Sequence, residues 1–388
     1  MSDLPVALVD RIRQRLSDES REPTAQSVAD ALRAENQLCG NGTVLALVDQ
    51  LRRDTMGAGP LESLLAIPGV TDVLVNGAND VYFDCGNGLE RARVGFFDDE
   101  AVRRLGQRLA AQGGRRLDDA SPFVDVRLPD GTRFHAVLAP LARPGTLLSL
   151  RVPAQRAFSL DELLASGTFN ELGAECLSRL ISSRSAFLIS GGTGTGKTTV
   201  LSALLSTVDP TERLVIVEDA TELRPNHPHV VGLEARPANI EGAGSIGLRE
   251  LVRQALRMRP DRLIVGEVRG AEVVELLAAL NTGHEGGCGT VHANAAADVP
   301  ARLEALGSAA GLPRAAVHSQ VASALDVVVH LARERDGRRM LRQIAVFMRG
   351  DGGLVEAVPA LTFSSGESVP GPGVVKLQGL IGTITVPQ

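Results

Sequence analysis

The chain has 388 residues, of which 44% are hydrophobic and 22% charged, and its formal net charge at pH 7 is −6. This length suits two or three domains, and the composition is that of a globular protein. The acidic balance, the single Tyr and the absence of Trp argue against nucleic-acid binding, which favours basic surfaces and aromatic stacking platforms.

The first residues and the cysteines indicate a reducing compartment. The chain starts with an acidic, polar stretch and not with a signal peptide, and no apolar run approaches 18 residues. The cysteines are far apart and form no CxxC pair, so neither a disulfide framework nor a zinc site is indicated: Cys39, Cys85, Cys176 and Cys288. We therefore expect a cytoplasmic protein without a transmembrane segment, which reaches a membrane only through a partner.

In the first half of the chain, the spacing of the apolar residues changes near Gly69. Residues 1–56 carry apolar side chains at helical spacing, which predicts an N-terminal helical region. The next hundred residues predict a smaller α+β domain over 57–157. Its expected elements are strands in 70–77, 81–84, 123–128, 133–138 and 147–152, and a helix at 99–112.

Residues 158–363 predict an α/β domain. Ser159 with Glu162 three residues later is a capping box that begins a helix. The later strand candidates are nearly continuous apolar runs, which suit a parallel sheet covered on both faces: 186–190, 214–217, 262–265 and 289–292. Residues 364–388 are rich in Gly, Pro and Ser, so we expect a weakly ordered tail.

One motif defines the α/β domain. Residues 191–198 match G-x-x-x-x-G-K-[ST] without a mismatch, between a predicted strand and a predicted helix. In this context the loop binds the phosphates of a nucleotide such as ATP, with Lys197 at the β- and γ-phosphates and the Thr198 hydroxyl on Mg²⁺. The expected nucleotide-binding residues are Gly191, Gly192, Thr193, Gly194, Thr195, Gly196, Lys197, Thr198 and Thr199.

Two further strand ends carry carboxylates. The strand at 262–265 runs into Gly266 and Glu267, a Walker B pattern with glycine where many P-loop enzymes have a metal-binding Asp. We expect Glu267 to serve the metal and its water. Glu218 or Asp219, at the end of the preceding strand, is positioned to polarise the attacking water, although acidic residues at a helix N-terminus would give the same spacing.

The segment 283–294 places His284 and His292 eight residues apart among glycines. Its H-E-G-G-C-G-T-V-H pattern fits none of the usual metal-ligand spacings, so a loop that senses phosphate or couples domains is the better interpretation. Arginines add possible phosphate contacts, although surface arginines are usually solvated: Arg133 and Arg151 on strands of the α+β domain, and Arg257, Arg259 and Arg269 around the Walker B strand.

These motifs together resemble the type II/type IV secretion ATPase superfamily, and most closely its tight-adherence (Flp pilus) branch. The resemblance rests on four ordered boxes: the P-loop, residues 218–223 as an Asp box, residues 256–270 as a Walker B region and residues 281–294 as a His box. Asp130-Gly131-Thr132-Arg133 and Leu150-Arg151 resemble the nucleotide-reaching arginines of the family. The His box departs from the family at Glu285 and at 287–289.

The resemblance implies a RecA-like ATPase domain with catalytic roles for Lys197, Glu218, Glu267, His292, Arg133 and Arg151. It implies a homohexamer, peripheral on the cytoplasmic face of the inner membrane, that uses ATP and Mg²⁺ and works through a polytopic platform protein. The expected function is a motor for pilus assembly or protein secretion. The alternatives are a nucleic-acid-translocating motor of the conjugation type and a nucleotide-gated scaffold without hydrolysis.

Overall fold

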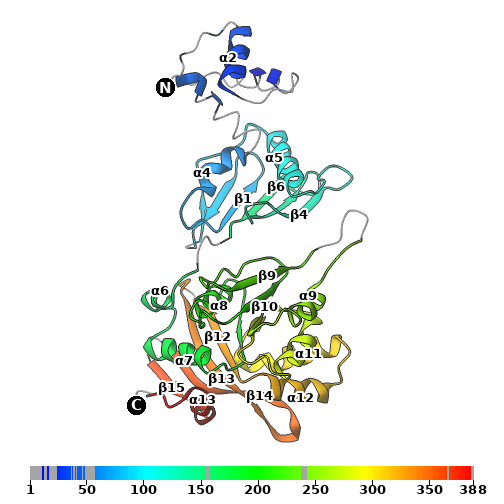
Figure 1. Cartoon of the computed structure of the whole chain (residues 1–388). Helices are drawn as coiled ribbons and strands as arrows, with labels where there is room; N and C mark the ends of the chain where they lie inside the picture. Colours follow the sequence, from blue (N-terminus) through cyan, green and yellow to red (C-terminus); the bar gives the residue numbers. More distant parts are fainter. Residues whose placement is uncertain are drawn as a thin grey trace. The chain divides into compact units, whose positions relative to one another are not determined.

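The computed structural model describes residues 11–12, 15–16, 24–35, 37, 40, 42–45, 47–48, 57–86, 88–153, 157–236, 243–334, 336–364 and 367–385. The chain divides into two compact units, Met1–Ala154 and Gln155–Gln388 (Figure 1). The first unit begins with the helix α2 (Ala25–Ala34), whose N-cap Thr24 forms a capping box with Ser27. The other helices expected within 1–56 lie largely outside the described residues.

Unit 1 contains a sheet whose neighbouring strands are all antiparallel, in the order β3-β2-β1-β6-β5-β4. The strands are β1 (Asp72–Asn76), β2 (Val81–Asp84), β3 (Leu89–Arg91), β4 (Phe123–Arg127), β5 (Arg133–Val137) and β6 (Leu147–Arg151). Helix α5 (Asp99–Gln112) buries Val102, Leu105 and Leu109 in the same core as the strands. A short α4 (Glu62–Leu65) precedes the sheet. The unit is therefore α+β, as the sequence predicted.

Unit 2 is built on a sheet in which, among the described residues, nine strands follow the order β15-β14-β13-β12-β7-β11-β10-β8-β9. The strands from β12 to β9 in this order run parallel, and β13 to β15 extend the sheet antiparallel. The bounds are β7 (Phe187–Gly191), β8 (Leu214–Glu218), β9 (Val230–Glu234), β10 (Arg262–Val268), β11 (Cys288–His292), β12 (Val327–Arg333), β13 (Arg339–Arg349), β14 (Val355–Ser364) and β15 (Glu367–Pro370).

Helices cover both faces of this sheet. Phe187 and Ile189 of β7 join one core with α6 (Leu160–Ala165), α7 (Glu171–Ser182), α8 (Lys197–Leu205) and α13 (Val374–Ile381). The alternate residue Leu188 joins a second core with α9 (Leu248–Ala255), α10 (Glu272–Leu280), α11 (Val299–Ala309) and α12 (Arg314–Ala324). Figure 1 shows α7 and α11 on opposite sides of the strands. Sheet strands buried on both faces explain the continuous apolar runs.

The expectation of a weakly ordered tail is wrong for residues 367–385. β15 pairs with β14, and α13 packs against α7 with Leu377 fully buried. Arg179 of α7 donates to the carbonyl oxygen of Thr383 at 2.8 Å, which ties the end of the chain to this helix. Within the described part of the chain, no helix has the length and apolar character needed to cross a bilayer.

Candidate nucleotide-binding site

The phosphate loop joins the end of β7 to the start of α8, as the sequence predicted. Gly194 and Gly196 have φ angles of +72° and +90°, which residues with a side chain rarely adopt. At Gly191 the limit is space, because a Cβ there would lie 2.5 Å from the carbonyl oxygen of Leu331. The glycines of the motif therefore allow the backbone conformation in which successive N–H groups face a phosphate chain.

The loop lysine occupies the centre of this site. Lys197 Nζ donates to the carbonyl oxygens of Gly191 and Gly192, each at 2.9 Å. Burial lowers the pKa of Lys197 below its usual value, and the charges of Glu267 and Glu222 oppose this shift. The ammonium group thus lies within electrostatic reach of carboxylates from both strand ends that the sequence singled out.

Glu218 ends β8 and is 6% exposed. Its Oε1 accepts the backbone N–H groups of Glu222 and Leu223, both at 3.0 Å. Burial raises the pKa of Glu218 to about 7, while these two hydrogen bonds favour the charged form. A carboxyl group with a pKa near neutral pH can accept a proton at physiological pH, which is what a general base needs.

The oxygen donors near the loop fit a magnesium ion. Thr198 Oγ1 lies 3.5 Å from Glu222 Oε2, and Glu267 lies 3.7 Å from Nη1 of Arg269, which also pairs with Asp219. Mg²⁺ prefers hard oxygen ligands and usually takes one or two carboxylates together with nucleotide phosphates. A hydroxyl and one or two carboxylates beside a phosphate loop match that donor set.

The two histidines of the His box lie at opposite ends of one strand. His292 ends β11 and is in register with Gly191, the first residue of the phosphate loop. His284 precedes the strand, and its Nδ1 donates to the carbonyl oxygen of Ala279 at 3.2 Å. Of the two, therefore, only His292 lies at the edge of the sheet that carries residues 191–198.

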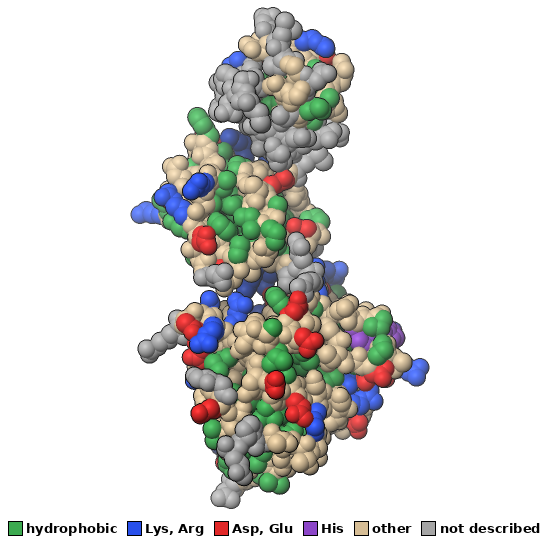
Figure 2. Space-filling view, turned by 90° about the vertical axis from the view of Figure 1, so that its left-hand side faces the viewer, with side chains coloured by type: hydrophobic (Ala, Val, Ile, Leu, Met, Phe, Trp, Pro, Cys, Tyr) green, Lys and Arg blue, Asp and Glu red, His purple; other side chains and the backbone are tan. Residues whose placement is uncertain are grey.

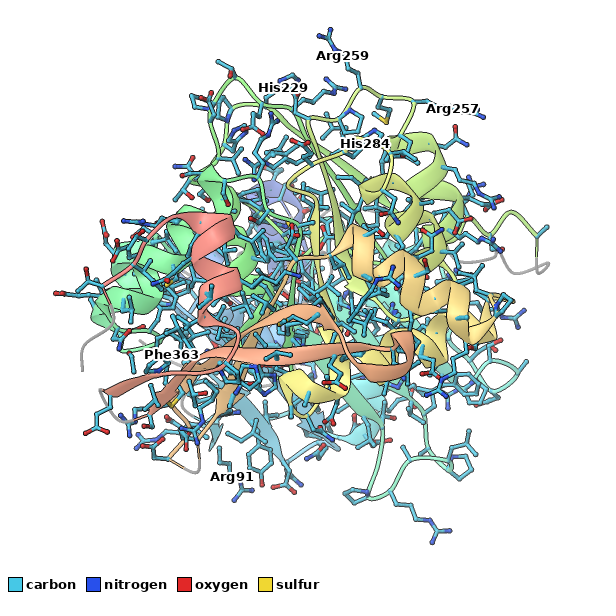
Figure 3. The ribbon with its side chains drawn as sticks, turned by 90° about the horizontal axis from the view of Figure 1, so that it is seen from below. Arg91, His229, Arg257, Arg259, His284 and Phe363 are labelled. Atoms are coloured by element: carbon cyan, nitrogen blue, oxygen red, sulfur yellow. The ribbon has the colours of Figure 1, made fainter. Side chains whose placement is uncertain are left out.

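The arginines around the Walker B strand are separated in the same way. Arg257 and Arg259 precede β10, whereas Arg269 follows it. Figure 3 shows Arg257 and Arg259 at one edge of unit 2 together with His229 and His284. Each of these residues precedes a parallel strand: β9 follows His229, β10 follows the two arginines, and β11 follows His284. The expectation that these arginines cluster for phosphate binding is wrong for the first two, because they lie at the amino ends of the strands.

Arg133 and Arg151 belong to unit 1, where they are paired. Arg133 on β5 is directly opposite Arg151 on β6, and Arg127 on β4 is opposite Arg133. Three arginines thus form a row across three adjacent strands. The sequence analysis did not single out Arg127, although the short gap between the strands expected at 123–128 and 133–138 indicates a hairpin that brings it opposite Arg133. It also left Glu222 unassigned among three neighbouring carboxylates.

Comparison with known proteins agrees with this geometry. Residues 54–350 match the family described as Type II/IV secretion system protein. The match covers more than half of the chain, so the chain belongs to this family, whose members are secretion ATPases. It is an ATPase motor of the kind that serves pilus assembly or secretion.

Two relatives illustrate the similarity of the chain to other proteins at the level of sequence. The chain is 55% identical over 321 residues to a putative conjugal transfer protein of Mycobacterium tuberculosis (strain H37Rv), covering 81% of this chain and 91% of the relative. It is 31% identical over 320 residues to the type IV secretion system protein PtlH of Bordetella pertussis, covering 75% and 94%.

Two solved structures support the fold alone. The DotB ATPase of Legionella pneumophila matches with a TM-score of 0.51 at 20% identity, over 74% of this chain and 78% of that one. The pilus retraction motor PilT matches with a TM-score of 0.52 at 18% identity, over 83% and 85%. The expected RecA-like fold class is thereby confirmed.

Proposed function

We propose that this ATPase binds ATP with Mg²⁺ on residues 191–199 and hydrolyses it there. The observation that carries the proposal is the convergence of Lys197, Glu218 and Glu267 at the carboxyl edge of one parallel sheet, where ligands of open α/β folds bind. The ion would be held by Thr198 and Glu267, and would neutralise charge on the phosphates.

Each side chain then has a separate task. Lys197 holds the phosphates, which replace the loop carbonyls as its partners. Glu218 accepts a proton from the attacking water, because it is the carboxyl with a pKa near neutrality. His292 is positioned to sense the loop from the adjacent strand. Arg133 and Arg151 supply positive charge to the bound nucleotide.

Family membership supports a proposal for the assembly. We infer a homohexamer of the tight-adherence branch, peripheral on the cytoplasmic face of the inner membrane, that acts on a polytopic platform protein. Unit 1 keeps large apolar side chains exposed, with Phe97 at 84% and Phe123 at 64%. Hydrophobic side chains also gather on the face of that unit seen in Figure 2. Exposed apolar surface of this kind is what partner subunits cover.

The nucleic-acid alternative remains testable, since relatives carry the words conjugal transfer in their names. The net charge of −6 and the scarcity of aromatic residues argue against a strand-tracking groove. Adding single- or double-stranded DNA should leave ATP turnover unchanged at low salt. A several-fold stimulation would favour the alternative.

The nucleotide site is tested by Lys197→Ala, with Lys376→Ala as the matched control. Lys376 is the only other lysine and lies in α13. The first variant should lose ATP turnover and bind a fluorescent ATP analogue weakly while keeping its melting temperature. The control should behave as wild type. Normal turnover by Lys197→Ala would refute the assigned site.

Magnesium is tested with Glu267→Gln, which keeps side-chain volume and removes the charge. Hydrolysis should nearly stop while the fluorescent analogue still binds. Titration of Mg²⁺ against EDTA should restore wild-type turnover and leave the variant inactive. Full turnover without a divalent ion would contradict the proposed metal requirement.

A further inference from the structure

The hairpin of β12 and β13 runs beside the phosphate loop. β12 is the parallel neighbour of β7, and His330 is in register with Ser190, one residue before the loop. The hairpin continues past the end of β7, because Leu331 approaches Gly191 closely enough to exclude a Cβ there. The residues at its tip are therefore held next to the loop by the sheet itself.

One arginine of this hairpin bonds to the loop. Arg339 Nε donates to the carbonyl oxygen of Gly194 at 3.0 Å. The Cδ atom of Arg339 lies 3.4 Å from the position that a Cβ on Gly196 would take. Arg333, its partner in register across the hairpin, has Nη1 3.8 Å from the corresponding position on Gly194. Two guanidinium side chains thus meet the middle of the phosphate loop.

The carbonyl groups of the loop need partners for a physical reason. When successive N–H groups face a phosphate chain, the carbonyl groups of the same peptides face elsewhere. Lys197 bonds to the first two carbonyl oxygens, and Thr195 Oγ1 also donates to Gly192 at 3.0 Å. Arg339 supplies the donor for Gly194. Unlike Lys197, it need not leave its carbonyl partner when a phosphate arrives.

Neighbouring arginines of this hairpin pair with carboxylates, whereas Arg339 donates to a carbonyl oxygen. The adjacent Arg338 pairs with Asp336 at 2.6 Å, and Arg342 lies 3.5 Å from Glu334. Within the described ranges, Arg339 and Arg333 make no such ion pair. A charged group makes a stronger hydrogen bond to a carbonyl oxygen than a neutral donor does, so Arg339 favours the present orientation of the Gly194 peptide.

We propose that Arg339 is a positioning residue that fixes the Gly194 peptide of the phosphate loop in the orientation that binds nucleotide. The inference rests on the proposed nucleotide site and adds a residue outside its motifs. Arg333 supports the same segment from across the hairpin. Loss of Arg339 frees the Gly194 peptide to rotate, so nucleotide binding weakens while the chemistry of bound nucleotide continues.

The test compares Arg339→Gln, Arg339→Lys and the control Arg338→Gln, which removes the same charge one residue away. The dissociation constant of a fluorescent ADP analogue, KM and kcat are measured for each full-length variant. Arg339→Gln should raise the dissociation constant and KM about tenfold and change kcat less than about twofold. Arg339→Lys should recover part of the loss, since an ammonium group can also donate to a carbonyl. Arg338→Gln should match the wild type.

Several results would overturn the proposal. Wild-type affinity in Arg339→Gln would do so, as would equal weakening by Arg338→Gln, which would indicate a general effect of charge. A fall in kcat with unchanged affinity would assign Arg339 to the hydrolytic step instead. Should Arg339→Gln melt early, the gain in melting temperature on adding ADP is compared with that of Arg339→Lys, and equal gains would refute the role. Normal binding by Lys197→Ala would refute the nucleotide site itself.

Discussion

Glu218 and Gly266 face each other across neighbouring strands so closely that a Cβ on the glycine would lie 2.5 Å from the glutamate Cγ. The penultimate Walker B position therefore requires glycine, because a side chain there would collide with Glu218. A side chain there would displace the one carboxyl group in this site whose pKa burial raises to about 7. Glycine at this position, where many P-loop enzymes have Asp, therefore leaves the space that the buried Glu218 side chain occupies.

Gly266→Ala should lower ATP turnover by tenfold or more, an order of magnitude typical for loss of a positioned base. Nucleotide binding should change little, because the loop and Lys197 are untouched. Gly232→Ala, on the outer strand β9 with nothing within 4 Å of its Cβ position, is the matched control. Unchanged turnover in Gly266→Ala would show that Glu218 can move without consequence.

Glu218 should also set the pH dependence. The carboxylate is the form that accepts a proton, so kcat/KM, which reports the free enzyme, should rise with pH through about 7. Glu218→Gln should lose turnover and this ascending limb. A wild-type profile that is flat between pH 6 and about 8 would contradict the role.

The same pKa shift predicts a stability effect of fixed sign. The unfolded chain releases this proton near 4.5, the ordinary pKa of a glutamate, and the folded chain near 7, so the unfolded state binds fewer protons between these two values. Stability from this group is complete below 4.5 and is lost as pH rises through 7. Urea unfolding at both ends of that range should show a smaller loss in Glu218→Gln than in wild type.

Arg133→Ala and Arg151→Ala should each slow hydrolysis by about tenfold, with a smaller loss of nucleotide affinity, since charge-assisted bonds to phosphate contribute about 1.5–3 kcal/mol. Arg91→Ala is the control, because Arg91 lies on the edge strand β3 of the same sheet and pairs with Asp80 at 2.7 Å. Wild-type turnover in both strand variants would make unit 1 a docking module.

The tail should contribute to the stability of unit 2. Leu377→Ala should destabilise the unit by about 2–5 kcal/mol, the usual range for a fully buried leucine. Val375→Ala, two residues away and 75% exposed, should be close to neutral. Equal urea midpoints for the two variants would mean that α13 does not pack in solution.

The elements predicted correctly are those in which the local residue pattern matches the environment of the element in the fold. The capping box of Ser159 and the strands at 123–128 and 214–217 appear where periodicity placed them. The tail was misjudged because its glycines suggested disorder. A Cβ on Gly373 would lie 2.7 Å from Val346 Cγ2, and one on Gly371 would lie 2.4 Å from the Pro359 carbonyl oxygen. These glycines permit close packing, which composition alone cannot distinguish from flexibility.

Site prediction had a similar limit. The phosphate loop and both strand-end carboxylates were found because each motif is local in sequence. The contact of Arg339 with Gly194 joins residues 145 positions apart, and only the pairing of β12 with β7 brings them together. The reverse holds for His284 and His292, which are close in sequence. Strand β11 runs between them, so they lie at opposite edges of the sheet.

The chain contains only two lysines, and one of them is the loop lysine. An amine reacts with acylating or aldehyde reagents in its neutral form, and burial lowers the pKa of Lys197 and so enlarges that fraction. The other lysine, Lys376, lies in α13 and donates to the carbonyl oxygen of Phe347. The protein is thus suited to affinity labelling: an amine-directed nucleotide analogue has one target at the site, and the competing amines, Lys376 and the amino terminus, lie in separate proteolytic fragments.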